Sequence, residues 1–375
     1  MQFGVPELED LPDVSGKSVL VRVDFNVPIK DGVIGDDLRI RAALPTLEWL
    51  TSHGAKVTCC THLGRPKGAP DPAFSVAPVR ARLAELAPGV ELLENLRFNP
   101  GETTNDDAFV QELIAGHDLY VNDAFGASHR AHASIVGPPK SLPSAAGRLL
   151  AKEVEVLVGL RDDPARPFVA ITGGSKVSDK LGVIEALLDI ADHLIIGGGM
   201  CFTFLSAMGH SIGASLFEAE QVDNCKRLLD SHGDRLHLPT DIVALSPDGK
   251  LFSDQGEVRH VGRDVPEGWM GVDIGPESAG TFSDIILEGR TILWNGPMGV
   301  FEDPRFEAGT KVVAEAVAES RGFSVIGGGD SAAAVAQFGL ASEVDHVSTG
   351  GGASLELIEQ GDLPGLEALR SAANG

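Results

Sequence analysis

Cysteine and aromatic residues are scarce in this chain of 375 residues, which has four cysteines, three tryptophans and one tyrosine. Cys59 and Cys60 are adjacent, and Cys201 and Cys225 fit no CxxC or zinc-binding spacing. The number and spacing of the cysteines therefore predict neither a disulfide framework nor a zinc site. Four free thiols are typical of a reducing compartment, so we expect a cytoplasmic protein.

Basic residues are outnumbered by acidic ones, 30 against 54, and the formal net charge is −24. Such a charge repels a nucleic-acid backbone unless the basic residues cluster strongly. Residues 1–6 contain no basic stretch followed by an apolar core. No uninterrupted apolar run approaches the length of about 18 residues that a membrane span needs. We therefore expect no nucleic-acid partner, no membrane association and no export.

The chain is long enough for more than one domain and is rich in glycine. At roughly 150 residues per domain, the chain length predicts two domains. Hydrophobic residues make up 43% and charged residues 22%, which is typical of a globular protein. Glycine, at 45 residues, exceeds its usual share of roughly 7%. The excess indicates backbone positions with special dihedral angles or a close approach to a ligand.

Short apolar runs rich in β-branched residues recur along the chain, each followed by a turn and a helical pattern. This alternation is typical of βα units in parallel sheets. The strands expected in the first half are residues 18–23, 56–61, 90–93 and 119–121. Those expected in the second half are residues 168–171, 193–196, 291–294, 323–326 and 346–348. The predicted fold class is α/β, with two Rossmann-like lobes that have parallel sheets and are joined by an interdomain helix and hinge.

The stretch 144–160 places its apolar residues close to one helical stripe, and a proline-rich segment follows at residues 162–167. We interpret residues 148–162 as an interdomain helix between an N-terminal domain, 1–147, and a C-terminal domain, 163–352. The alternative is an ordinary crossover helix inside one large sheet, because strand patterns continue on both sides. The chain length favours two domains.

Arginines follow the predicted strands of the first half. Ligands of open parallel sheets gather beyond the carboxyl ends of the strands. If these strands are neighbours, one rim carries imidazoles and four arginines, namely Arg39, Arg65, Arg97 and Arg130. Guanidinium groups bind carboxylate and phosphate oxygens in a bidentate manner, so the rim predicts a site for a small polyanion. The alternative is four separate surface arginines in solvated ion pairs.

Glycines take the place of arginines at the turns of the second half, in clusters at residues 173–174, 197–199, 327–329 and 350–352. Glycine lets backbone N–H groups at helix N-termini approach phosphate oxygens. Lys176 and Lys180 are spaced to lie on one helix face above the first cluster. The pattern predicts a nucleotide site, and the alternative is that the glycines only make tight turns.

Several named motifs are absent or incomplete. No GxxxxGK[ST] sequence and no HRD or DFG signature occurs, so a P-loop ATPase or protein kinase is not supported. Residues 327–332 match a relaxed dinucleotide fingerprint, but the next strand lacks the acidic residue that binds a ribose. His129 and His132 could ligate a metal but lack a third ligand at a matching spacing. A nicotinamide dehydrogenase and a non-catalytic two-lobed anion-binding protein remain as alternative interpretations.

Motifs along nearly the whole chain resemble those of the phosphoglycerate kinase family. They lie at residues 22–28, 62–66, 93–98, 122–126, 129–132, 173–180, 294–297, 327–331 and 348–354. The resemblance implies a glycolytic phosphotransferase with a carboxyl group as acceptor. Its reaction is reversible transfer of a phosphoryl group from 1,3-bisphosphoglycerate to Mg-ADP, which gives 3-phosphoglycerate and ATP.

The resemblance also implies the roles of individual residues. The N-terminal domain would hold the glycerate substrate through Asp24, Phe25, Asn26, Arg39, His62, Leu63, Gly64, Arg65, Arg97 and Arg130. The C-terminal domain would hold ADP or ATP through Gly174, Lys176, Lys180, Gly198, Gly271, Asn295, Glu302, Gly328, Gly329, Asp330 and Ser331. Within that set Glu302 would bind the ribose and Asp330 the Mg²⁺. The catalytic residues would be Arg39, Lys176 and Gly351. Residues 353–375 would return to the N-terminal domain, and we expect a monomer.

A carboxylate is already ionised at neutral pH, so this reaction needs no general base. Catalysis then consists of positioning and neutralisation of charge on the phosphoryl group, and the lobes must close on a hinge. The chain departs from the family in three places. Between Ala87 and Glu91 it lacks a βα unit of about twenty residues, so we expect the N-terminal sheet to lack an edge strand. Ser175 and Met298 replace other residues beside the nucleotide and are expected to tune its affinity.

Overall fold

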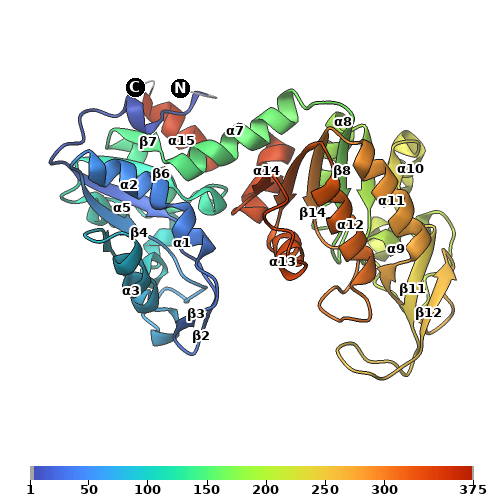
Figure 1. Ribbon diagram of the computed structural model, residues 1–375. Helices are drawn as coiled ribbons and strands as arrows, with labels where there is room; N and C mark the ends of the chain where they lie inside the picture. Colours follow the sequence, from blue (N-terminus) through green and yellow to red (C-terminus); the bar gives the residue numbers. More distant parts are fainter. Residues whose placement is uncertain (1–3, 374–375) are drawn as a thin grey trace. The chain divides into compact units, whose positions relative to one another are not determined.

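The computed structural model describes residues 4–373 and consists of two compact units (Figure 1). Unit 1 comprises the chain up to Gly159 together with the segment from Gly352 onward, and unit 2 is Leu160–Gly351. Each unit contains a parallel sheet flanked by helices, which confirms the predicted α/β class. Within the described residues, no helix has both the length and the apolar character needed to cross a membrane.

The sheet of unit 1 has five parallel strands in the order β5-β4-β1-β6-β7. The strands are β1 (Ser18–Val23), β4 (Lys56–Cys60), β5 (Glu91–Leu92), β6 (Leu119–Asp123) and β7 (Ser144–Ala146). Val21 aligns with Cys59 on one side and with Val121 on the other, and all three are fully buried. Strands buried on both faces read as continuous apolar runs, which is why β1 and β6 are recognisable in the sequence.

The strand β7 occupies the start of the stretch 144–160, in which the apolar residues follow a helical stripe. Ser144 aligns with Tyr120 of β6, and the helix α7 (Arg148–Asp162) begins only after Gly147. Pro143 restricts the preceding residue to extended backbone, and its own carbonyl accepts a hydrogen bond from the Tyr120 N–H at 3.1 Å. The chain is therefore extended and paired here before the helix starts.

The outer strand of this sheet, β5, is only two residues long. It follows the helix α3 (Ala77–Leu86) after a short turn, at the place where the sequence lacks a βα unit. Arg80 of α3 donates a hydrogen bond from its Nε to the carbonyl oxygen of Leu92 at 3.1 Å. A charged side chain thus covers the edge of this short strand, and such cover discourages pairing with other chains.

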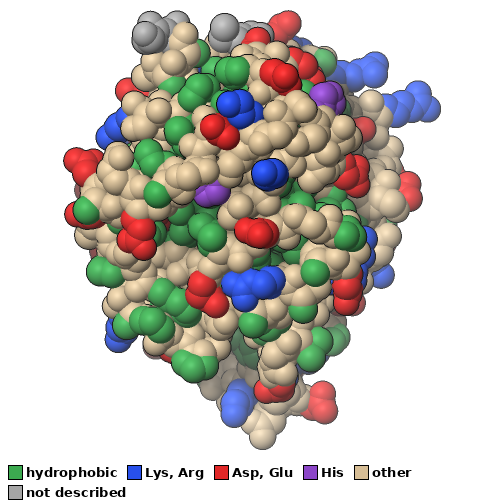
Figure 2. Space-filling model, turned by 90° about the vertical axis from the view of Figure 1, so that its left-hand side faces the viewer, with side chains coloured by type: hydrophobic (Ala, Val, Ile, Leu, Met, Phe, Trp, Pro, Cys, Tyr) green, Lys and Arg blue, Asp and Glu red, His purple; other side chains and the backbone are tan. Residues whose placement is uncertain are grey.

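Helices and a hairpin complete unit 1. They are β2 (Ile29–Lys30), β3 (Val33–Ile34), α1 (Leu38–Ala42), α2 (Leu44–Ser52), α4 (Gly101–Thr104), α5 (Asp107–Ile114), α6 (Ala133–Val136), α14 (Gly351–Gln360), whose first residue belongs to unit 2, and α15 (Pro364–Ala373). The last helix, α15, packs against α6 and β7, and the Gly365 N–H donates to the Ser128 carbonyl at 2.9 Å (Figure 1). On the face of unit 1 drawn in Figure 2, acidic, basic and hydrophobic side chains are interspersed.

The main sheet of unit 2 has six parallel strands in the order β10-β9-β8-β14-β15-β16. They are β8 (Phe168–Thr172), β9 (His193–Ile196), β10 (Leu236–His237), β14 (Thr291–Asn295), β15 (Phe323–Gly327) and β16 (His346–Val347). Five of these were expected. The helices are α8 (Leu181–Ile190), α9 (Cys201–Ala207), α10 (Val222–His232), α11 (Pro276–Glu288), α12 (Ala308–Glu319) and α13 (Gly329–Gln337).

Unit 2 also contains an antiparallel sheet that the sequence analysis missed. Its order is β12-β11-β13, with β11 (Asp241–Leu245), β12 (Val258–Gly262) and β13 (Met270–Ile274). The strand β12 is almost entirely exposed, so it lacks the apolar run by which buried strands are recognised. Its partner β11 is buried throughout and packs with Phe306 in a small core.

Candidate functional site

A pocket of about 610 Å³ lies in unit 1 among the loops that follow β1, β4, β5 and β6. It is lined by Asn26, His62, Gly64, Arg65, Pro66, Arg97, Thr103, Gly126, Ala127, His129, Arg130 and His132. The structure thus brings three of the four predicted arginines, Arg65, Arg97 and Arg130, to one cavity. Phe25 and Leu63 are buried in the core instead, so their side chains do not line the pocket.

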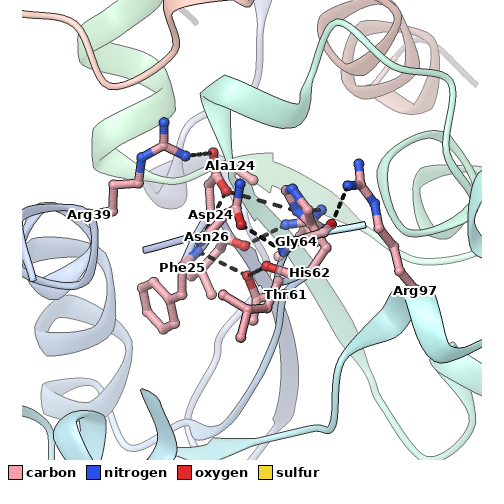
Figure 3. Close-up of polar contacts among 12 residues, drawn as sticks. Asp24, Phe25, Asn26, Arg39, Thr61, His62, Gly64, Arg97 and Ala124 are labelled. Carbon is pink, nitrogen blue, oxygen red and sulfur yellow. Dashed lines mark hydrogen bonds and ion pairs between the residues drawn. The ribbon is translucent and has the colours of Figure 1, made fainter. Parts of the chain in front are cut away.

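Arg39 is not part of this lining and instead binds Asp24. Its Nη1 donates to Asp24 Oδ2 at 2.7 Å, and Figure 3 shows Arg39 and Arg97 on opposite sides of the labelled residues. Burial opposes ionisation of Asp24, but the positive charges of Arg39 and Arg22 help to hold the pKa of Asp24 below its ordinary value. The Asp24 carboxylate therefore stays ionised and fixes the Arg39 side chain.

Hydrogen bonds tie the pocket loops to one another. The Gly64 N–H donates to the side-chain oxygen of Asn26 at 2.9 Å, and Arg97 Nη1 donates to the Gly64 carbonyl at 2.8 Å (Figure 3). The Nε of Arg97 is buried and has no protein partner. A buried donor without a partner is costly, so a ligand oxygen at this atom would be stabilising.

His62 is a neutral hydrogen-bond donor toward this pocket. Burial lowers its pKa to about 3, despite the opposing charge of Asp24. A guanidinium can only donate, so Arg22 Nη2, 3.1 Å from His62 Nδ1, makes that nitrogen the acceptor. The proton of the neutral ring therefore sits on Nε2, where it can be donated to an oxygen of an anion.

Because His62 is buried in its neutral form, we expect the folded protein to be less stable at acid pH. Between pH 6.5 and 3 the unfolded chain protonates His62 while the folded chain does not, so stability falls as the pH falls through this range. Between pH 6.5 and 4.5 the free energy of unfolding of His62→Gln should fall by about 2 kcal/mol less than that of wild type, as measured by urea unfolding. The exposed His260 is the control, and His260→Gln should keep the wild-type dependence. An unchanged dependence for His62→Gln would contradict the assignment.

The buried groups behind His62 are not among the residues that the sequence predicted for the site. Arg22 has no exposed surface, and its Nε donates to Ser134 Oγ at 2.9 Å. Ser134 in turn donates its hydroxyl to the fully buried Glu102 at 2.7 Å. A charged residue inside the apolar run of β1 was the available signal for Arg22. Nothing local in the sequence pointed to its partners, because Ser134 is 112 residues away.

Unit 2 contains two pockets of about 220 Å³ each that share Gly174, Ser175 and Asp330. Their walls include every predicted nucleotide residue, namely Gly174, Lys176, Lys180, Gly198, Gly271, Asn295, Glu302, Gly328, Gly329, Asp330 and Ser331. Met298 and Ser175, the two departures from the family pattern, also line this region. Gly271 is required by packing, since a Cβ there would lie 2.1 Å from the Phe202 ring.

The glycine turns present helix N-termini. Gly174 and Gly328 have φ values of +109° and +89°, a backbone region that favours glycine. The helix α13 starts directly after Gly328, and its first-turn N–H groups have no partner within the helix. Such an end attracts phosphate. Gly351 lies outside the lining of both pockets and packs on Gly328, where an added Cβ would be 2.7 Å from the Gly328 Cα.

The two lysines do not share a helix face, which corrects the prediction. Residues 173–180 are not helical, and α8 begins at Leu181. Lys180 Nζ donates to the Gly173 carbonyl at 2.7 Å and to both oxygens of Asn295 at 2.9 and 2.6 Å. Burial lowers its pKa to about 8, although Asp330 and Asp179 oppose the shift. Lys180 therefore fastens two strand-end turns together, while Lys176 is exposed at the pocket.

Asp330 is a residue of unit 2 that could hold a metal ion. It is exposed in the first turn of α13 and lines both pockets. Within residues 4–373, no group of three or more His, Cys, Asp or Glu side chains could hold a metal by itself. One carboxylate beside a glycine turn at a helix start would fit Mg²⁺ that arrives with a nucleotide, because Mg²⁺ keeps several waters and binds phosphates.

Comparisons with known proteins agree with this arrangement. The family model described as phosphoglycerate kinase matches residues 8–91 and 86–361, and the two parts meet where the sequence lacks a βα unit. A phosphoglycerate kinase of Rubrobacter xylanophilus is 52% identical over 95% of this chain and 96% of its own length. One from Salinispora arenicola is 52% identical over 98% of this chain and 100% of its own length.

Solved structures show the same likeness. Phosphoglycerate kinase from Coxiella burnetii superposes with a TM-score of 0.88 at 38% identity, over 98% of this chain and 99% of that one. The enzyme from Pyrococcus horikoshii has a TM-score of 0.85 at 31% identity, over the same shares of the two chains.

The fold and the two kinds of pocket define a two-unit α/β phosphotransferase. The chain belongs to the phosphoglycerate kinase family. Phosphoglycerate kinase activity, with a nucleotide as one substrate, is accordingly its function. This membership sets aside the dehydrogenase and the non-catalytic binding protein.

Proposed function

We propose that the protein moves a phosphoryl group between 1,3-bisphosphoglycerate and Mg-ADP, with the acid held by unit 1 and the nucleotide by unit 2. The observation that carries this proposal is the contrast between the two sets of pockets. Three arginines line the cavity of unit 1, whereas glycine turns at helix starts line those of unit 2. The first suits a small phosphorylated acid and the second a nucleotide.

In unit 1, the guanidinium groups of Arg65, Arg97 and Arg130 would bind the phosphate of the glycerate substrate. Asn26 and the Nε2 proton of His62 would donate to its hydroxyl or carboxylate oxygens, because both residues line the same cavity. Arg39, fixed by Asp24, would face the phosphoryl group that is transferred. These residues supply hydrogen-bond donors and positive charge but no general base. A general base is not needed, because the reacting carboxylate is already ionised at neutral pH.

In unit 2, Glu302 would accept hydrogen bonds from the ribose, and the turn at Gly328 and Gly329 would receive the phosphates. Asp330 would hold the Mg²⁺ that accompanies the nucleotide. When bound, this ion would neutralise charge on the phosphates. Lys180 contributes indirectly, because it holds the turns after β8 and β14 in place.

In the direction of ATP synthesis, an oxygen of the terminal phosphate of ADP bonds to phosphorus while the bond to the acyl oxygen breaks. The leaving group is a carboxylate that needs no proton. Lys176, Arg39 and the start of α14 at Gly351 would neutralise the charge that develops. Closure on a hinge that includes α7, the interdomain helix at residues 148–162, would bring the reactants together. The chain would act as a monomer, because each pocket is lined within one unit. It would work in the cytoplasm, because its four cysteines are free thiols.

The direct test is a coupled assay with ATP and 3-phosphoglycerate, in which a dehydrogenase reduces the acyl phosphate formed. We expect turnover that requires both substrates and Mg²⁺. Light scattering at assay concentration should give the mass of one chain. Turnover without 3-phosphoglycerate, or none at saturating substrates, would overturn the proposal.

A further inference from the structure

Arg305 binds a distant hairpin loop to the segment that carries Glu302. Its Nη2 donates to the Lys250 carbonyl at 2.9 Å, and its Nη1 donates to the Gln255 carbonyl at 3.1 Å. Both carbonyls belong to the loop between β11 and β12. The guanidinium also lies over the Phe306 ring, 4.7 Å from its centroid, so most of its donors and one face are in use.

Asp303 is the centre of this arrangement. It is 2% exposed and accepts hydrogen bonds from Arg305 Nε at 3.0 Å and Nη2 at 2.7 Å. The hydrogen bonds from Arg305 keep the pKa of Asp303 at about 2, so the buried carboxylate is ionised. Its Oδ2 also accepts the Phe252 N–H at 2.7 Å, and Phe252 has a φ of +59°, which is unfavourable for a non-glycine residue.

Glu302 stands directly before Asp303, between two anchored aromatic residues. Phe301 and Phe306 are 3% and 0% exposed and belong to different core clusters. The Val300 N–H donates to the Val272 carbonyl of β13 at 2.9 Å. Glu302 itself is exposed and lines the nucleotide pocket. The position of the Glu302 carboxylate therefore depends on the segment 299–306. The Arg305–Asp303 pair stabilises this segment on the side away from the pocket lining.

We propose that Arg305 and Asp303 are positioning residues for the nucleotide: together they fix the segment 299–306 so that the Glu302 carboxylate meets the ribose hydroxyls. This inference rests on the proposed function, in which Glu302 binds the ribose. Neither residue lines the pocket, so both act through Glu302. Loss of Arg305 would leave the buried Asp303 carboxylate without its charged partner, and the segment would rearrange.

The experiment compares Arg305→Ala with Arg259→Ala. Arg259 offers a matched control, since it makes the same kind of bidentate pair with Glu257, at 2.7 and 3.0 Å, and lies 4.6 Å from the Trp269 ring centroid. Its partner is exposed and is remote in sequence from Glu302. For Arg305→Ala we expect KM for ATP to rise about tenfold, with kcat and KM for 3-phosphoglycerate within about twofold of wild type. Arg259→Ala should leave all three unchanged.

A second nucleotide separates positioning of Glu302 from general damage. The analogue 2′,3′-dideoxy-ATP has no hydroxyl for Glu302 to bind, so wild type and Arg305→Ala should bind it with equal affinity in calorimetry. A tenfold loss for both nucleotides, or an equal effect of Arg259→Ala, would overturn the inference. If Arg305→Ala fails to fold, Arg305→Lys replaces it in the same comparison. Lysine keeps the charge but cannot form the bidentate pair with Asp303. Inactive wild-type enzyme would instead count against the proposed function.

Discussion

Replacement of Lys176 by alanine should reduce kcat by at least about a hundredfold while ADP and 3-phosphoglycerate continue to bind. Lys176 is exposed and lines the pocket formed by the glycine turns. A cation there would stabilise charge that develops on the transferring phosphoryl group, and this interaction would be stronger in the transition state than with bound substrates. The loss should therefore fall on kcat rather than on KM.

Steady-state kinetics of the coupled reaction, with calorimetry for each substrate alone, measures this division. Lys176→Arg should recover part of the rate, because it restores the charge without the same geometry. Lys311→Ala, on the exposed face of α12, is the control and should behave as wild type. An unchanged kcat for Lys176→Ala would show that the catalytic role is wrongly assigned.

Lys180→Ala should give a different result from Lys176→Ala, although the two lysines look alike in the sequence. The Lys180 ammonium binds the Gly173 carbonyl and two oxygens of Asn295, so its loss leaves the Gly173 carbonyl and the side-chain oxygen of Asn295 without this donor. We expect a lower melting temperature in addition to lower activity. A melting temperature equal to that of wild type would contradict this structural role.

The parallel sheets could be predicted because their strands are buried on both faces. The run from Phe168 to Thr172, for example, is fully buried and reads as an uninterrupted apolar strand. The antiparallel sheet could not be recognised as a whole in this way, although its strand β11 is buried throughout. Its strand β12 has an exposed Arg259 and His260 and is held mainly by backbone pairing with β11.

The site residues also divide into those that the sequence could predict and those that it could not. Arg65, Arg97 and Arg130 could be predicted because strand ends of a parallel sheet converge, and the structure gathers them around one cavity. The partners that orient these groups could not be predicted, because hydrogen bonds such as Arg22 to His62 join residues 40 positions apart. The placement of Lys180 failed for a related reason. The prediction placed residues 176–180 in a helix, but the helix α8 begins only at Leu181. The turn at Gly174, with a φ of +109°, takes the preceding backbone out of the helical region.

Replacement of Arg39 by alanine should lower kcat by about ten- to a hundredfold, with smaller changes in KM. The guanidinium is the one predicted arginine outside the unit 1 cavity, and Asp24 fixes it at 2.7 Å. In that position it would neutralise the phosphoryl group during transfer rather than bind the resting substrate. Arg41→Ala is a matched control, since Arg41 lies on the same helix and pairs at 2.8 Å with Asp37.

The loss of Arg39 also removes a partner from a buried carboxylate, which could by itself disturb the loop after β1. The double substitution of Arg39→Ala with Asp24→Asn separates the two effects, because asparagine has the same shape without the charge. If the rate defect comes from missing positive charge, the double variant stays as slow as Arg39→Ala. If it comes from the unpaired Asp24, the double variant recovers, and Arg39 is then a structural partner rather than a catalytic residue.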